Sequence, residues 1–166
     1  MTVNIFLKIK AVTLHHLHQT LKNHYTNYFK FYQQIILMKK ILVTGGLGFI
    51  GSHTVVELQQ NGYEVLIIDN LSNTTIDVLS KITSITGKQP IFENIDLKNQ
   101  LEIQNFFRLN KNIDGIIHFA ASKAVGESVE KPLEYYHNNI SSLIYLLEEM
   151  GVNNITNFIF SSSCTV

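Results

Sequence analysis

The chain has 166 residues, 45% of them hydrophobic, and its 13 basic and 13 acidic residues cancel. This length suffices for one domain with a sizeable core, and a chain with a single arginine, Arg108, is not expected to capture nucleic acid through its phosphates. An anionic ligand would therefore be held mostly by backbone N–H groups. The only cysteine, Cys164, excludes an internal disulfide and a cysteine-rich metal site, and it fits a reducing, cytoplasmic setting.

Residues 1–38 differ from the rest, since they are rich in Asn, His, Lys, Tyr and Phe and contain no glycine or proline. Lys8 and Lys10 interrupt the apolar run near the start, so we expect neither a secretory signal nor a membrane-spanning helix. The four histidines here have no carboxylate or cysteine beside them, and we expect no metal site. Because Met38 directly precedes the first strand, residues 1–38 are predicted to be an extension outside the fold and residues 39–166 to form the domain.

An unbroken apolar run, Ile41 to Val43, predicts a short buried strand, and a glycine-rich turn follows it. Gly46, Gly48 and Gly51 fit the pattern G-x-G-x-x-G, and Gly45 replaces Gly46 in the related G-x-x-G-x-x-G spacing. In a nucleotide-binding turn, Gly45 and Gly46 would adopt backbone angles that a side chain forbids. Gly48 would let the main chain approach a pyrophosphate, and Gly51 would let the next helix pack tightly. The alternative is a glycine turn without a ligand.

A helix after this turn would end at Asn61-Gly62, and the second strand, Tyr63 to Ile68, leads to Asp69. Asp69 lies 18 residues after Gly51, close to the separation at which a carboxylate binds the adenosine ribose of a dinucleotide. A carboxylate there would repel the extra phosphate of NADP, and no arginine stands nearby to attract it. The pattern therefore favours NAD, unless Asp69 merely ends the strand.

Strands and helices keep alternating along the rest of the chain. The expected elements are a helix around Ile76 to Ile82, a strand from Ile91 to Ile95, a helix around Leu101 to Phe107, a strand from Ile113 to Phe119, a loop over 120–128, a helix from Pro132 to Gly151, and a strand from Asn157 to Phe160. This order predicts an α/β fold with a Rossmann-type, doubly wound parallel sheet of about five strands.

Ligands bind at the carboxyl ends of the strands in such sheets. Five strand exits should therefore meet there: the glycine turn, Asp69, Asp96, Ala120 to Lys123, and Ser161 to Ser163. We expect His118, inside an apolar strand, to be a hydrogen-bonded core residue without a catalytic role. The tyrosines at positions 135, 136 and 145 have helical spacing and are expected to be packing residues.

Five motifs together resemble the UDP-glucose 4-epimerase family of extended short-chain dehydrogenases/reductases. They are Thr44 to His53, Asp69 to Asn73, His118 to Ala121, Lys123 to Tyr136, and Phe158 to Ser163. The glycine turn marks only the superfamily. The Asp69 to Asn73 loop and the Lys123 to Tyr136 run are more specific, and they favour the epimerases over their dehydratase and decarboxylase relatives. The resemblance covers residues 39–166.

The resemblance also implies roles for individual residues. The pyrophosphate of NAD would be surrounded by Gly45, Gly48, Phe49, Ile50 and Gly51, and the adenosine ribose would be held by Asp69, Asn70, Leu71, Ser72 and Asn73. Asp96 and Leu97 would flank the adenine, whose exocyclic amine would donate to Asp96. The nicotinamide side would be lined by Phe119, Ala120, Ala121, Ser122 and Lys123, with Lys123 on the ribose hydroxyls and Asn138 nearby. Ser163 matches the family serine that hydrogen-bonds the sugar hydroxyl under oxidation.

The implied activity is an isomerase that interconverts UDP-glucose and UDP-galactose through a 4-keto intermediate with bound NAD. The family's general base is a tyrosine in a Tyr-x-x-x-Lys pair, and none of the seven tyrosines here has a lysine four positions on. In the family this pair and the UDP-sugar domain lie beyond the point where this chain ends. We therefore expect an amino-terminal fragment that is inactive alone, and a homodimer for the complete enzyme, without nucleic-acid or membrane partners.

Smaller departures from the family are Ser122, where the family is usually apolar, His137, where an acid is common, and Cys164, usually alanine. Two alternatives stay open. One is another NAD-dependent sugar-nucleotide enzyme, such as a 4,6-dehydratase, and the other is a non-catalytic NAD-binding module.

Overall fold

The structure, a computed structural model, describes residues 38–162 together with Gln19 and Lys22. The chain divides between Met38 and Lys39, and the fold below belongs to the second unit. The predictions for the four histidines before Met38 and for Ser163 lie outside the described residues. Within the described part, no helix is both long enough and apolar enough to cross a membrane.

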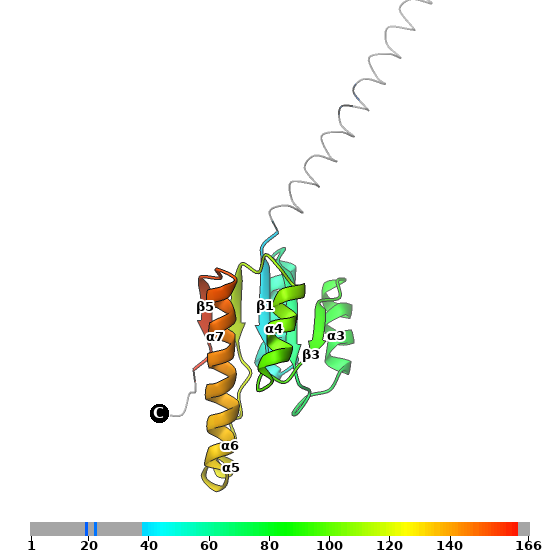
Figure 1. Cartoon of the computed structure of the whole chain (residues 1–166). Helices are drawn as coiled ribbons and strands as arrows, with labels where there is room; N and C mark the ends of the chain where they lie inside the picture. Colours follow the sequence, from blue (N-terminus) through cyan, green and yellow to red (C-terminus); the bar gives the residue numbers. More distant parts are fainter. Residues whose placement is uncertain (1–18, 20–21, 23–37, 163–166) are drawn as a thin grey trace, which may run out of the picture. The chain divides into compact units, whose positions relative to one another are not determined.

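Five parallel strands form one sheet in the order β3-β2-β1-β4-β5 (Figure 1). They are β1 (Lys40–Thr44), β2 (Glu64–Asp69), β3 (Ile91–Asn94), β4 (Gly115–His118) and β5 (Asn157–Phe160). The central strand β1 pairs with β2 on one side and with β4 on the other. The chain thus moves outward from β1 to β3 and then returns to the other side of β1. This topology confirms the predicted doubly wound, Rossmann-type parallel sheet, and it places the switch point between β1 and β4, where such sheets bind ligands.

Helices cover both faces of the sheet. They are α2 (Phe49–Gln60), α3 (Asp77–Thr86), α4 (Gln100–Leu109), α5 (Val125–Glu130), α6 (Pro132–Tyr136), the π-helical turn η1 (His137–Ser141) and α7 (Ser142–Val152). Core contacts put α2 and α3 on one face and α4 and α7 on the other, where Figure 1 shows α4 and α7 in front of the strands.

The strands are apolar on both faces because both faces are covered. In β2, Leu66 and Ile68 pack into one cluster with Phe107 of α4, while Val65 and Ile67 pack into the other with α2 and α3. These side chains are almost fully buried. Burial of each such side chain contributes about 1.5 to 3 kcal/mol. The unbroken apolar runs of the sequence therefore belong to strands enclosed between two helical layers.

Two predicted segments differ from the observed ones. The expected loop over 120–128 is helical from Val125 onward, as α5. The expected continuous helix from Pro132 to Gly151 consists of α6, the π-helical turn η1 and α7. A five-residue π turn leaves the apolar spacing almost unchanged, so the sequence pattern did not reveal it. Its stabilising contacts come from a distant loop, described below.

Candidate functional site

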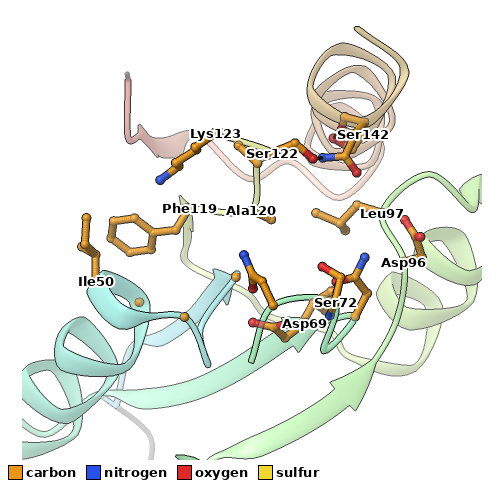
Figure 2. Close-up of a pocket in the computed structure, with 18 of the residues that line it drawn as sticks. Ile50, Asp69, Ser72, Asp96, Leu97, Phe119, Ala120, Ser122, Lys123 and Ser142 are labelled. Atoms are coloured by element: carbon orange, nitrogen blue, oxygen red, sulfur yellow. Dashed lines mark hydrogen bonds between the residues drawn. The ribbon is translucent and has the colours of Figure 1, made fainter. Parts of the chain in front are cut away.

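A cavity of about 720 Å³ lies at the carboxyl ends of four strands (Figure 2). The loops after β1, β2, β3 and β4 form most of its wall, and the segment from α5 to α7 forms the remainder. Its lining residues are Gly45, Gly48, Phe49, Ile50, Gly51, Ile68, Asp69, Asn70, Ser72, Asn73, Ile95, Asp96, Leu97, Phe119, Ala120, Ala121, Ser122, Lys123, Ala124, Glu127, Tyr135, Asn138 and Ser142. Every residue predicted to bind the cofactor lies here except Leu71. The fifth strand exit that was predicted to meet there follows β5. Its residues Ser161 and Ser162 do not line the cavity, and Ser163 is outside the described residues.

The glycine turn is tight enough to explain its glycines. Gly45 has a φ of +67°, and its N–H donates to the carbonyl of Ile68 over 2.8 Å, which ties the turn to β2. A Cβ on Gly51 would lie 2.2 Å from the carbonyl oxygen of Gly45, so no side chain fits there. The reason predicted for Gly46 is wrong: its φ is not left-handed, and a Cβ there would instead meet the Ile67 side chain at 2.8 Å.

Helix α2 begins at this turn, and the backbone N–H groups of its first turn have no partner within the helix. Its N-cap is Gly48, and no side chain of the described residues caps it. The N–H groups of Phe49, Ile50 and Gly51 belong to the first helical turn and have no partner within the helix. Because these residues line the cavity, the donors and the positive end of the helix dipole favour an anion there.

Asp69 lies at the end of β2 and is 6% exposed. One carboxylate oxygen accepts a hydrogen bond of 3.0 Å from the N–H of Leu47, and the other accepts one of 3.0 Å from the N–H of Leu71. Thr74 donates its hydroxyl to the carbonyl of Leu47 over 2.8 Å, which adds a second link between the two loops. Asp69 thus joins the exits of β1 and β2, and its remaining lone pairs are available to a ligand.

The loop after Asp69 is shaped by its own side chains. The Asn70 side chain accepts a 3.1 Å hydrogen bond from the N–H of Ser72, while Leu71 has a φ of +57° and packs against the core. Leu71 therefore does not line the cavity, whereas Asn70 and Ser72 do. At the exit of β3, Asp96 accepts a 2.9 Å hydrogen bond from the N–H of Lys98 and lines the cavity beside the buried Leu97.

The loop after β4 is bound to the helical segment that follows it. The N–H of Ser122 donates to Asn139 Oδ1 over 2.8 Å, and Asn139 Nδ2 donates to the Ser122 carbonyl over 3.0 Å. Asn138 Nδ2 donates to the Ser122 hydroxyl oxygen, also over 3.0 Å. In Figure 2, Ser122 and Lys123 lie on the opposite side of the cavity from Asp69 and Ser72.

His118 is the hydrogen-bonded core residue that its strand predicted. Its Nδ1 lies 2.6 Å from the hydroxyl oxygen of Thr44, its partner across the β1–β4 ladder, and both residues are buried. Its ring stacks near Phe160, with centroids 5.7 Å apart. Burial, and to a lesser extent the charge of Lys123, lower the pKa of His118 to about 4, so the ring is neutral near pH 7.

Six lining residues were not predicted: Ile68, Ile95, Ala124, Glu127, Tyr135 and Ser142. Tyr135 donates its hydroxyl to Glu127 Oε2 over 2.9 Å. Desolvation, then this bond and the charge of Glu127, raise the pKa of Tyr135. Among the three tyrosines expected to pack, Tyr145 does contact the core and Tyr136 is exposed. Helical spacing alone gave no signal that Tyr135 faces the cavity.

A parallel α/β sheet with a glycine turn, a free helix N-terminus and an acid after the second strand defines a dinucleotide-binding protein of the Rossmann type. The model of the NAD-dependent epimerase/dehydratase family matches residues 41–166. The chain belongs to this family.

Within this family, the chain is similar to UDP-glucose 4-epimerases. A UDP-glucose 4-epimerase of Schizosaccharomyces pombe is 51% identical over 126 residues, covering 76% of this chain and 35% of that protein. The UDP-glucose 4-epimerase of Bifidobacterium longum, solved with NAD⁺ and UDP, has a TM-score of 0.74 at 46% identity, covering 77% of this chain and 38% of that one. The enzyme of Stenotrophomonas maltophila, solved with NAD and formylated UDP-arabinopyranose, has a TM-score of 0.73 at 44% identity, with the same coverage. The chain thus spans little more than a third of the length of these relatives.

Proposed function

We propose that this chain is the amino-terminal, NAD-binding part of an enzyme that interconverts UDP-glucose and UDP-galactose. One observation carries the proposal: the exits of four strands meet in one cavity and bring together nearly every residue that the resemblance to the epimerases assigns to the cofactor. The identity of about 50% to UDP-glucose 4-epimerases supports this substrate class over that of other family members. The domain division, with residues 39–166 as the NAD-binding part and 1–38 as an extension, belongs to the same proposal.

The residues of the cavity fit NAD in their chemistry. The N–H groups of Phe49, Ile50 and Gly51, which have no partner within the helix, suit the pyrophosphate, and the absence of side chains at Gly48 and Gly51 lets it approach the main chain. At one end, Asp69, Asn70, Ser72 and Asn73 would hold the adenosine ribose, with Asp96 and Leu97 around the adenine. At the other end, Phe119 to Lys123 and Asn138 would line the nicotinamide.

The charge distribution favours NAD over NADP. Asp69 is a buried carboxylate that accepts hydrogen bonds from two backbone N–H groups, and its negative charge would repel a phosphate on the neighbouring ribose hydroxyl. Lys123, the cationic residue that lines the cavity, lies on the side opposite Asp69 (Figure 2). Lys123 would therefore bind the hydroxyls of the nicotinamide ribose and could not compensate a phosphate near Asp69.

When bound, NAD supplies a nicotinamide ring that accepts a hydride from C4 of the sugar and returns it to the other face. The protein's part is to hold and orient the two reactants. Ser163 would accept or donate a hydrogen bond at the sugar hydroxyl under oxidation. The Tyr-x-x-x-Lys pair that deprotonates this hydroxyl in the family is absent from the 166 residues, so we propose that this chain alone does not turn over substrate.

We further propose a homodimer for the complete enzyme. Exposed apolar side chains recur every three or four residues along α6, η1 and α7, the spacing of one helix face. This apolar stripe consists of Leu133, Tyr136, Ile140, Ile144 and Leu147, which are 44% to 80% exposed. Contiguous exposed apolar surface of this kind is typical of a protein interface. A cytoplasmic location fits the single cysteine, and no nucleic-acid or membrane partner is proposed.

The test is calorimetric titration of the purified chain with NAD, NADP and UDP-galactose. We expect binding of NAD, binding of NADP that is weaker by about tenfold or more, and very weak binding of UDP-galactose, because a single like-charge contact costs about 1 to 4 kcal/mol. If NAD does not bind, or if NADP binds more tightly, the proposal is wrong. The non-catalytic alternative would be favoured if a complete form with the residues beyond Val166 bound NAD and failed to convert UDP-galactose.

A further inference from the structure

Asn139 makes an unusual pair of contacts with a loop 17 positions away. Its side-chain amide accepts from the N–H of Ser122 over 2.8 Å and donates to the carbonyl of the same residue over 3.0 Å. The N–H and C=O of one residue point to the same side only when its backbone is extended, as in a strand facing its neighbour. Asn139 therefore acts on Ser122 as a neighbouring strand would, and it fixes both peptide groups that flank this residue.

The π-helical turn η1 makes this contact possible. Asn138 and Asn139 are adjacent, yet the side chains of both reach Ser122, one at its hydroxyl and one at its backbone. Adjacent residues of an α-helix point about 100° apart. The wider turn over 137–141 brings the two amides to the same loop, and the hydroxyl of Ser142 donates to the carbonyl of Asn138 in the following turn. Single π turns of this kind are rare and occur often at functional sites.

We propose that Asn139 is a positioning residue for the nicotinamide half of the cofactor, a role that rests on the function proposed above. Asn139 itself does not line the cavity. It acts through Ser122, whose carbonyl belongs to the peptide that carries Lys123, and so it sets the direction in which Lys123 leaves the backbone. Among the described residues, loss of these two bonds would leave one hydrogen bond between residues 120–123 and the segment of η1 and α7, the bond from Asn138 to the Ser122 hydroxyl.

Asparagine satisfies both groups, because its amide carries one acceptor oxygen and one donor nitrogen. An aspartate at 139 keeps the acceptor for the Ser122 N–H and loses the donor for its carbonyl, and a leucine of similar size loses both. The third contact, from Asn138 to the Ser122 hydroxyl, exists because residue 122 is a serine where the family is usually apolar. The hydroxyl accepts in this bond, so its own hydrogen points elsewhere, and no atom of the described residues accepts it. This hydrogen is available to the carboxamide or ribose of the bound nucleotide.

The experiment compares two ligands on the 166-residue chain. NAD contains both halves of the dinucleotide, and ADP lacks the nicotinamide together with the ribose that carries it. We expect Asn139→Leu to weaken the affinity for NAD by about tenfold, the effect of one to two lost hydrogen bonds, and to leave the affinity for ADP within about twofold of the parent value. Asn139→Asp, which keeps one bond, should have an intermediate effect. Titration calorimetry measures the affinity of each variant and of the parent for both ligands.

A matched control is His137→Leu, because His137 lies in the same π turn, is exposed and does not line the cavity. It should change neither affinity. Hydrogen exchange of the Ser122 amide gives a second measurement, which Asn139→Leu should accelerate by about tenfold or more. Equal loss of both affinities, or an unchanged Ser122 exchange rate, would overturn the positioning role. If the parent binds neither nucleotide, the proposed function fails on its own, and the exchange rate still decides whether Asn139 holds the loop.

Discussion

Asp69 and Leu47 are joined by a hydrogen bond of 3.0 Å between a buried carboxylate and a backbone N–H, and this bond connects the loops after β1 and β2. The other carboxylate oxygen holds the N–H of Leu71 at the same distance. One side chain thus fixes the glycine turn, the start of the next loop and the charge at this end of the cavity. Changing it should affect both stability and ligand preference.

Asp69→Asn removes the charge and leaves an NH₂ group facing one of the two backbone donors. We expect a loss of about 1 to 3 kcal/mol in the free energy of unfolding, the cost of an unsatisfied buried group. The ratio of NAD to NADP affinity should fall by about tenfold, since the charge repulsion is gone. Urea unfolding and calorimetry measure the two effects. The control is Asp77→Asn, an exposed acid outside the cavity, and an equal shift of the ratio in both variants would contradict the role of Asp69.

Gly51→Ala should prevent the turn from closing. The new Cβ would lie 2.2 Å from the carbonyl oxygen of Gly45, which is backbone and cannot move aside as a flexible side chain would. We expect a destabilisation of about 3 kcal/mol, the upper end of overpacking effects. Gly151→Ala is the matched control, because nothing lies within 4 Å of its Cβ position in α7 and alanine is the better helix former. It should stabilise by up to about 1 kcal/mol in the same unfolding assay.

Loss of stability on acidification should depend on His118. Its pKa is about 4 in the folded chain against 6.5 when unfolded, so between these values the unfolded state binds more protons and stability falls as the pH decreases. From pH 7 to pH 5 this amounts to about 2 kcal/mol. In His118→Gln this part of the slope should disappear, although the variant is less stable at pH 7. Urea unfolding at the two pH values tests this, with His53→Gln, an exposed histidine, as control. Parallel slopes for parent and His118→Gln would contradict the prediction.

The apolar stripe should determine self-association. Ile144→Glu places a charge in the middle of the stripe, and in a symmetric dimer two such charges would meet or be buried, at a cost of several kcal/mol. We expect the dimer to dissociate at least about tenfold more readily, measured by sedimentation equilibrium. Ile85→Glu is the control, because Ile85 is 61% exposed on α3, which covers the other face of the sheet. A parent chain that is already monomeric at high concentration would count against the proposed interface for this chain.

Much of the fold could be predicted because its signals are local. The run from Ile41 to Val43 is apolar on both faces, and a glycine turn followed it at once, so strand, turn and helix could be assigned in order. The alternation of strands and helices predicted that the strand exits meet at one edge of the sheet, and the bond from Leu47 to Asp69 joins the first two of them. The prediction failed at Gly46, whose lack of a side chain is explained by the close packing of Ile67. It also failed at the loop over 120–128, part of which forms α5. Both features depend on neighbouring segments that no local sequence pattern reveals.

The sequence by itself determined the order of strands and helices, the glycine turn and the acid after the second strand, because apolar periodicity and backbone stereochemistry act between residues a few positions apart. Only the tertiary structure decided which side chains of those elements face the cavity. In the folded chain, Leu71 packs against the core and Tyr135 donates a hydrogen bond to Glu127. Asn139, in a π-helical turn, binds the backbone of Ser122. Such contacts depend on how distant segments pack, so their geometry exists only once the sheet and its helices have come together.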